Sequence, residues 1–426
     1  MRIGMFHARS REYTVTLAML TAILVLSILF FPERAFQSSL GGLTIWWTIV
    51  FPSMLPFLML SEMMSGFGAV RGLGTMLEPL MRFMFRLPGH GGWAIAIGAV
   101  TGMPAGAEAA GKLRRENLVS REEGERLLAL SHVASPFFIL TVIGAGFLHN
   151  VATGVVIAIV HYVSAIGTVL LLRFFWRGTD SATLAPTPLL ANRKAKDARK
   201  PIIVRALSDM HHARLEDGRS FGKLLGDSVS GAIQSLMMIG GTMIVFSVML
   251  GVMDTVGIAR LLSEAVAMAV PNMPSPVESI KSGLSGLLEV HVGTYLLGQP
   301  RLPASVTAAL IGAALAWSGL AVHLQVQTAI RHTDLRYRYF LLSRIVHAGL
   351  SFVLTLLLWR PLTGWFHGSL PSFLSDPASR SPHNGLTSWS VWTVVPHRLI
   401  ELAVLLAIAI GLSLIVSVFL RLGKAK

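Results

Sequence analysis

The 426-residue chain is 53% hydrophobic and 14% charged with a mean hydropathy of +0.63, which excludes an ordinary soluble domain, where about 25% of residues are charged. The formal net charge of +14 does not indicate nucleic-acid binding, because the basic residues flank apolar segments instead of lying among aromatic ones. The absence of cysteine excludes disulfides, thiolate metal sites and cysteine nucleophiles. We therefore expect an integral membrane protein that binds no nucleic acid.

Apolar segments of membrane-spanning length follow one another along the chain. At 1.5 Å per residue, each is long enough to cross a hydrocarbon core of about 30 Å. The first follows three arginines and ends in Phe30-Phe31-Pro32-Glu33 instead of the small residues of a signal-cleavage site, so we expect a retained helix. The expected spans are 14–31, 44–66, 126–148, 151–174, 226–252, 305–329, 340–360 and 396–420.

Two further apolar stretches, 91–111 and 283–298, are interrupted by polar or helix-breaking residues. If both turn back to the side from which they enter, 29 of the 36 Lys and Arg residues fall on one side of the membrane, including those of 112–126 and 331–344. Such a bias marks the cytoplasmic side. The sequence therefore predicts an all-α polytopic membrane protein with about eight transmembrane helices plus two re-entrant helical hairpins, and with both termini in the cytoplasm.

The same plan occurs on either side of a long polar segment: a span, an amphipathic piece, a Gly-rich hairpin and an interrupted span. The matched positions are Ser61, Gly102 and Ser135, which are 41 and 33 residues apart, and Ser247, Gly286 and Ser318, which are 39 and 32 apart. The first unit begins with a span that runs inward and the second with one that runs outward. This predicts two inverted repeats, as in alternating-access carriers. Because the matched residue types are common, chance similarity is the alternative.

Six regions follow from this plan. They are an N-terminal transmembrane helix and external loop (1–43), a first repeat (44–175), a basic cytoplasmic linker (176–225), a second, inverted repeat (226–360), an external loop (361–395) and a C-terminal transmembrane helix (396–426). The linker is interpreted as a solvated segment whose basic run also attracts anionic lipid.

The first hairpin contains residues that interrupt a helix. Gly102 and Gly106 permit a turn and a close backbone approach, and Pro104 suits the start of a helix but breaks one already running. We expect helix, tip and helix, with the N–H groups of the second arm directed into a cavity. In the next span, Ser135 is expected to cap a half-helix that starts at Pro136. A simple proline kink is the alternative.

Ionisable residues gather in these interrupted segments, where an unpaired charge costs several kcal/mol. They are candidates for substrate contact or proton coupling; for any single residue a structural hydrogen bond or an interfacial position is the alternative. The candidate substrate-binding residues are Gly102, Pro104, Gly106, Glu108, Ser131, His132, Ser135, Pro136, Gly286, Glu289, His291, Ser318 and His323. No enzyme signature occurs, so we expect neither catalysis, nor a cofactor, nor a metal site.

Several short motifs in order resemble the YlbJ-type sporulation integral membrane proteins. They are Phe51-Pro-Ser-Met-Leu-Pro-Phe57, Leu77-Glu-Pro-Leu80, Leu87-Pro-Gly89, Thr101-Gly-Met-Pro-Ala-Gly106, Lys112-Leu-Arg114, Glu125-Arg126 and Ser131-His-Val-Ala-Ser-Pro136. The resemblance implies a pair of nucleoside-recognition (Gate) domains, a relation to concentrative nucleoside carriers, and export of dipicolinic acid from the mother cell across the outer forespore membrane. The sodium and ribose motifs of nucleoside carriers have no clear match here.

Residues and resemblance together predict a membrane carrier for a small organic anion, dipicolinate, that works by alternating access. A nucleoside or other polar-metabolite carrier and a non-transporting scaffold for spore envelope assembly are the alternatives. The expected partners are the anionic substrate, the lipid bilayer and, as an open option, further copies of the chain; a proton or sodium ion is the candidate coupling ion. The expected location is the inner membrane of the cell.

Overall fold

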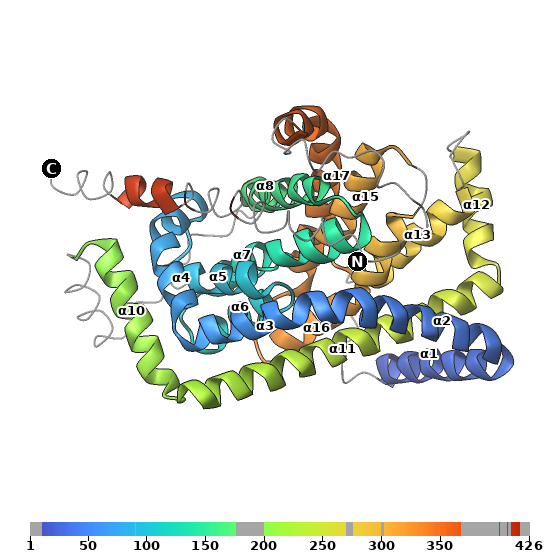
Figure 1. The fold of residues 1–426 in the computed structure, drawn as a ribbon, viewed down its shortest axis with the longest axis horizontal. Coiled ribbons are helices and arrows are strands. Elements are labelled where there is room, and N and C mark those ends of the chain that lie inside the picture. Colours follow the sequence, from blue (N-terminus) through green and yellow to red (C-terminus); the bar gives the residue numbers. More distant parts are fainter. Residues whose placement is uncertain are drawn as a thin grey trace, which may run out of the picture.

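A computed structural model describes residues 11–89, 91–175, 200–269, 276–299, 302–367, 400, 407 and 410–417. These residues are almost entirely helical, and the structure is that of an all-α polytopic membrane protein (Figure 1). Five helical segments in the described part are long and apolar enough to span a membrane: Pro32–Gly66, Val151–Leu172, Phe221–Thr255, Ala304–Ile330 and Tyr337–Gly364. Of the other three expected spans, 14–31 matches the 20-residue helix α1 (Arg11–Phe30) except for its last residue. The span 126–148 is split in two, and 396–420 lies mostly outside the described residues.

The expected external loop before residue 44 is wrong, because the chain is helical there. α2 (Pro32–Ile45), η1 (Trp46–Val50) and α3 (Phe51–Gly66) form one continuous helix of 35 residues. Pro32 is tolerated because it occupies the first turn, where its missing N–H has no helical acceptor. Gly42 is retained within the helix because Ser247 packs directly against its backbone.

This long helix runs antiparallel to α11 (Phe221–Thr255). Gly66 lies against Leu224 at one end, Trp46 Nε1 donates to Leu236 O at 2.9 Å in the middle, and Arg34 pairs with Asp254 at 3.7 Å at the other end. Each helix opens one half of the molecule, so the first spans of the two halves have opposite directions.

The elements that follow recur in the same order in both halves. The first half continues with α4 (Ala69–Leu80), η2 (Met81–Phe85), a hairpin of α5 (Gly91–Thr101) and α6 (Ala105–Arg115), an interrupted helix of α7 (Arg121–Ser131) and η3 (Phe138–Phe147), and α8 (Val151–Phe175). The second continues with α12 (Ile258–Ala269), a hairpin of α13 (Pro276–Leu288) and α14 (Val290–Leu297), an interrupted helix of α15 (Ala304–Trp317) and α16 (Gly319–Ile330), and α17 (Tyr337–His367).

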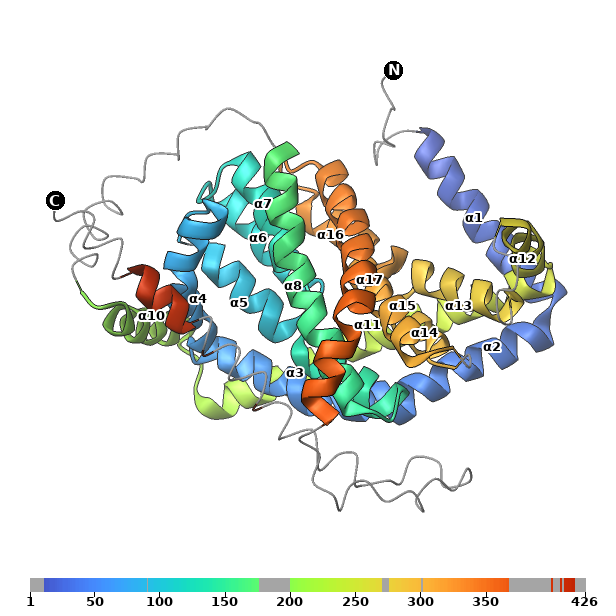
Figure 2. The ribbon, with the colours of Figure 1, turned by 90° about the horizontal axis from the view of Figure 1, so that it is seen from above.

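The two hairpins open toward opposite ends of the span Ala304–Ile330 (Figure 2). At the end of the first hairpin, Arg115 donates to Ala329 O at 3.1 Å, close to the end of that span. At the end of the second, Gly298 lies only six residues before the start of the span and packs against Leu148. The backbone therefore has the arrangement that an inverted repeat requires; the exact domain boundaries remain predictions.

The second part of the segment predicted as a basic cytoplasmic linker is helical. α10 (Ile202–Asp217) packs against α4 and lies crosswise to α11, which begins at Phe221 (Figure 1). Residues 176–199 lie outside the described part. α17 continues to His367, so the start of the expected external loop 361–395 is also helical, and the rest of that loop is not described.

Candidate functional site

In each half, glycines that have no room for a side chain bring the hairpin against the interrupted helix or bring its two arms together. A Cβ on Gly106 would collide with Ser131 O, and Gly102, at φ +90°, lies beside Ser135. In the second half, Gly293 touches Gly286 across the hairpin, and Gly319 packs against the tip. These close approaches place each hairpin tip at a helix break.

The first break has the structure that the sequence predicts for a capped half-helix. α7 ends at Ser131, residues His132–Ser135 are not helical, and the chain becomes helical again at Pro136. Ser135 Oγ accepts a hydrogen bond from Phe138 N at 3.2 Å, so Ser135 caps the new helix as expected. Ser131 Oγ donates to Gly106 O at 2.9 Å and ties the break to the hairpin.

The breaks of the two halves meet each other. His132 Nε2 lies 3.2 Å from the hydroxyl of Ser318, which occupies the turn between α15 and α16 at φ +78°. Both side chains are fully buried, and the His132 ring packs edge-on against Phe340. His132 Nδ1 is buried without a hydrogen-bond partner in the described structure. The meeting point therefore offers one unused polar atom where the two halves join.

Glu289 caps the second arm of its own hairpin. It is buried at the start of α14, where Oε2 accepts from Val292 N and Oε1 lies 2.6 Å from His291 Nδ1. The His291 ring in turn packs against Phe138 of the first half, with the ring centres 5.1 Å apart. Both carboxylate oxygens are thus already bound, which stabilises this tip.

The remaining candidates have different positions. His323 lies between Trp317 O, at 2.9 Å, and the Tyr337 hydroxyl, at 2.7 Å, so both of its ring nitrogens are bound. Pro104 precedes α6, whose start has no side-chain cap. Glu108 is exposed on α6 and is not part of the cluster at the breaks.

Sequence reasoning missed Arg344, which was counted with the cytoplasmic basic residues. The structure places it inside α17 at 1% exposure. Its guanidinium donates to Ala129 O at 2.6 Å and to His132 O at 2.7 Å, the free carbonyl groups at the end of α7. A cation is favoured at a helix C-terminus, so Arg344 stabilises the break from the opposite half. The signal was an Arg344-x-x-His347 pair within an apolar run.

Two residues of α8 complete this support. Ala134 N donates to His161 Nε2 at 3.1 Å, and the Tyr162 hydroxyl donates to Ala134 O at 2.7 Å. His347 bridges the two helices, since its Nδ1 lies 3.2 Å from Arg344 and its Nε2 lies 3.0 Å from His161 O. The non-helical backbone of the break thus has side-chain partners from α8 and α17.

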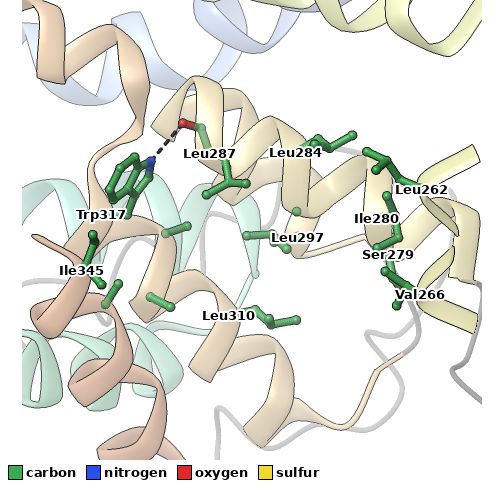
Figure 3. A pocket seen from close by; sticks show the side chains of 15 residues that line it. Leu262, Val266, Ser279, Ile280, Leu284, Leu287, Leu297, Leu310, Trp317 and Ile345 are labelled. Carbon is green, nitrogen blue, oxygen red and sulfur yellow. Dashed lines mark hydrogen bonds between the residues drawn. The ribbon is translucent and has the colours of Figure 1, made fainter. Parts of the chain in front are cut away.

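A separate pocket of about 580 Å³ lies among α12, α13, α14, α15 and α17 (Figure 3). Its walls are nearly all apolar, and its one indole N–H, on Trp317, is already donated to Leu287 O at 2.9 Å. Such mainly apolar walls do not compensate a charged ligand for its loss of hydration. Among the described residues, no group of three or more acidic or histidine side chains is arranged to hold a metal ion.

Paired hairpins, interrupted helices and apolar spans define an all-α polytopic membrane protein. Over 357 residues the chain is 35% identical to the sporulation integral membrane protein YlbJ of Bacillus subtilis (strain 168), and the match covers 84% of this chain and 85% of that protein. The chain belongs to the YlbJ family of sporulation integral membrane proteins. No family model matches the chain, and no solved structure matches it.

Proposed function

We propose that this protein carries a small organic dianion, dipicolinate, across a membrane of the sporulating cell by alternating access. The observation that carries the proposal is the contact between His132 and Ser318, where the helix breaks of two oppositely directed halves meet. A site at such a junction is open to one side or the other as the halves rock against each other. A scaffold needs no such junction.

The preference for an anion rests on the helix starts at the breaks. In the second half, the carboxylate of Glu289 accepts from the backbone at the start of α14. In the first half, α6 starts at Pro104 in the equivalent position, but no side chain caps it. Because helix N-termini bind anions, this start is suited to a carboxylate of the substrate.

The buried charge at the junction favours the same ligand. Arg344 stays protonated, and in the described structure no salt bridge joins it to a carboxylate. Its positive charge therefore acts on the break, where His132 is its neighbour through the backbone carbonyl. A dianion gains from this charge, whereas an uncharged nucleoside does not.

Family membership supports a proposed location as well. A sporulation membrane protein that moves dipicolinate toward the forespore acts in the outer forespore membrane, with both termini in the mother-cell cytoplasm. The substrate and the bilayer are then its partners, and no cofactor enters the cycle.

Purified protein in liposomes tests the proposal. Uptake of labelled dipicolinate is expected, with little uptake of labelled uridine. The His132→Ala variant should lose uptake, while His149→Ala, a change at an exposed histidine, should keep it. Uptake of uridine instead of dipicolinate would identify a nucleoside carrier. Uptake of neither, together with normal sporulation of a strain carrying His132→Ala and Glu289→Ala, would favour a scaffold.

A further inference from the structure

The break of the first half is held by a cluster of buried titratable groups, of which the two histidines have no part in the proposed substrate contact. His161, His347 and Arg344 are at most 1% exposed and lie behind residues His132–Ser135. The rings of His161 and His347 are 4.9 Å apart.

Hydrogen bonds fix the protonation of His161. Its Nε2 accepts from the backbone N–H of Ala134 at 3.1 Å, and a nitrogen that accepts carries no proton. The single ring proton is therefore on Nδ1, which is buried and has no partner in the described structure. His161 is neutral in this conformation.

Four titratable groups surround His161. Arg344 and His347 face it from α17, His132 lies on the break and Tyr162 is its neighbour on α8. The other helices that pack closely on α8, η3 and α15, contain no titratable side chain. The charged residues of α7 lie in its first turns, where Glu125 binds Arg336 at 2.6 Å, and Arg82 of η2 pairs with Glu78. Among the described residues, no carboxylate is bound to His161 to stabilise an imidazolium.

We propose that His161 is the proton-binding group of the carrier and that the coupling ion is a proton. This inference rests on the proposed function. A proton can add to Nε2 only when the Ala134 N–H has moved away, so protonation favours the conformation in which the break has separated from α8. A proton gradient then shifts the equilibrium between the conformation that has this hydrogen bond and the conformation that lacks it.

A transport measurement tests the inference directly. Wild type, His161→Gln and the control His149→Gln are reconstituted in liposomes, and uptake of labelled dipicolinate is measured with and without a pH difference. For one coupled proton, the accumulation ratio of wild type and control should change up to about tenfold per pH unit. In His161→Gln, the amide oxygen can still accept from Ala134 but does not titrate, so uptake should persist without responding to the gradient. An unchanged response in this variant would overturn the inference.

A second measurement does not depend on transport. As the pH falls from about 8 to about 5, the range in which histidine titrates, thermal stability of the purified wild type should decrease because protonation opposes the Ala134 bond. His161→Gln should lose less stability over this range. Coincident curves for the two proteins would overturn the inference even if dipicolinate is not the substrate, whereas absence of dipicolinate uptake with distinct curves would contradict only the proposed function.

Discussion

The two hairpins share a plan but differ in their chemistry. The tip of the second is closed by its own side chain, since Glu289 is buried and binds the start of α14. The tip of the first is not capped by any side chain, and its nearest acidic residue, Glu108, is exposed. The same backbone arrangement therefore gives one half whose helix start is bound by its own carboxylate and one half whose helix start is the proposed site for an anion.

The helix breaks of the two halves also differ in the residues that hold them. The second break turns on Ser318, whose hydroxyl contacts His132 of the first half, and His323 of its own half bonds to Trp317 O beside it. The first is held by His161 and Tyr162 of its own half and also by Arg344, a charged residue of the other half. Movement of the halves relative to each other should therefore act mainly on the first break.

The largest expected effect comes from Arg344→Met. Two buried carbonyl groups would lose their charged donor, and each such loss costs about 1–3 kcal/mol. Thermal unfolding in detergent should show strong destabilisation, whereas Arg344→Lys should retain part of the stability. His323→Phe, which affects only the second half, should cost less. Arg338→Met, at an exposed position, serves as the control; an equal effect of Arg338 and Arg344 would refute the asymmetry.

Glycine substitutions in the two hairpins distinguish an effect on packing from an effect on ligand binding. Gly106→Ala and Gly293→Ala each place a methyl group against backbone, so both should destabilise by about 1–3 kcal/mol. Only Gly106→Ala should also weaken dipicolinate binding, measured by calorimetry, because it alters the open helix start. Gly241→Ala has open space around it and should stabilise the exposed helix slightly. Equal loss of binding in both tight variants would remove the distinction between the hairpins.

Much of this architecture was predictable from the sequence because membrane constraints act locally. Hydrophobic length identified the spans, and Pro104 and Pro136 marked the interrupted helices. Arg344 was misplaced because its partners, the carbonyl oxygens of Ala129 and His132 at the end of α7, lie more than 200 residues away and leave no charge pattern. The expected loop before residue 44 is helical because α11 packs against it, a tertiary contact that composition does not encode.

The acidic residues of the two hairpins should respond differently to removal. Glu289→Ala deletes a helix cap and the partner of His291, so it should cost about 1–2 kcal/mol of stability. Glu108→Ala should stay within about 0.5 kcal/mol because the side chain is exposed. Chemical denaturation of the two variants under the same conditions makes the comparison. A larger effect at Glu108 would be inconsistent with an open first tip.

The smallest expected effect concerns the contact between the first hairpin and the end of the second interrupted helix. Arg114 binds Asp334 at 2.7 Å and lowers the pKa of that carboxyl. The pair therefore stabilises fully above the unfolded pKa of about 3.9, and this contribution disappears as the pH falls through the lower folded pKa. Because Asp334 is largely exposed, Asp334→Asn should cost less than about 1 kcal/mol at pH 7, with no difference from wild type in strong acid. A difference that persists in acid would contradict this electrostatic origin.

The opposite orientation of the two hairpins is tested most directly by labelling from one side of the membrane. Because the chain contains no cysteine, Arg115→Cys and Gln299→Cys provide single reactive positions at the bases of the first and second hairpins. In sealed inside-out vesicles, an impermeant thiol reagent should label position 115 and reach position 299 only after the membrane is permeabilised. Labelling of both positions from the same side would contradict the shared junction between oppositely directed halves.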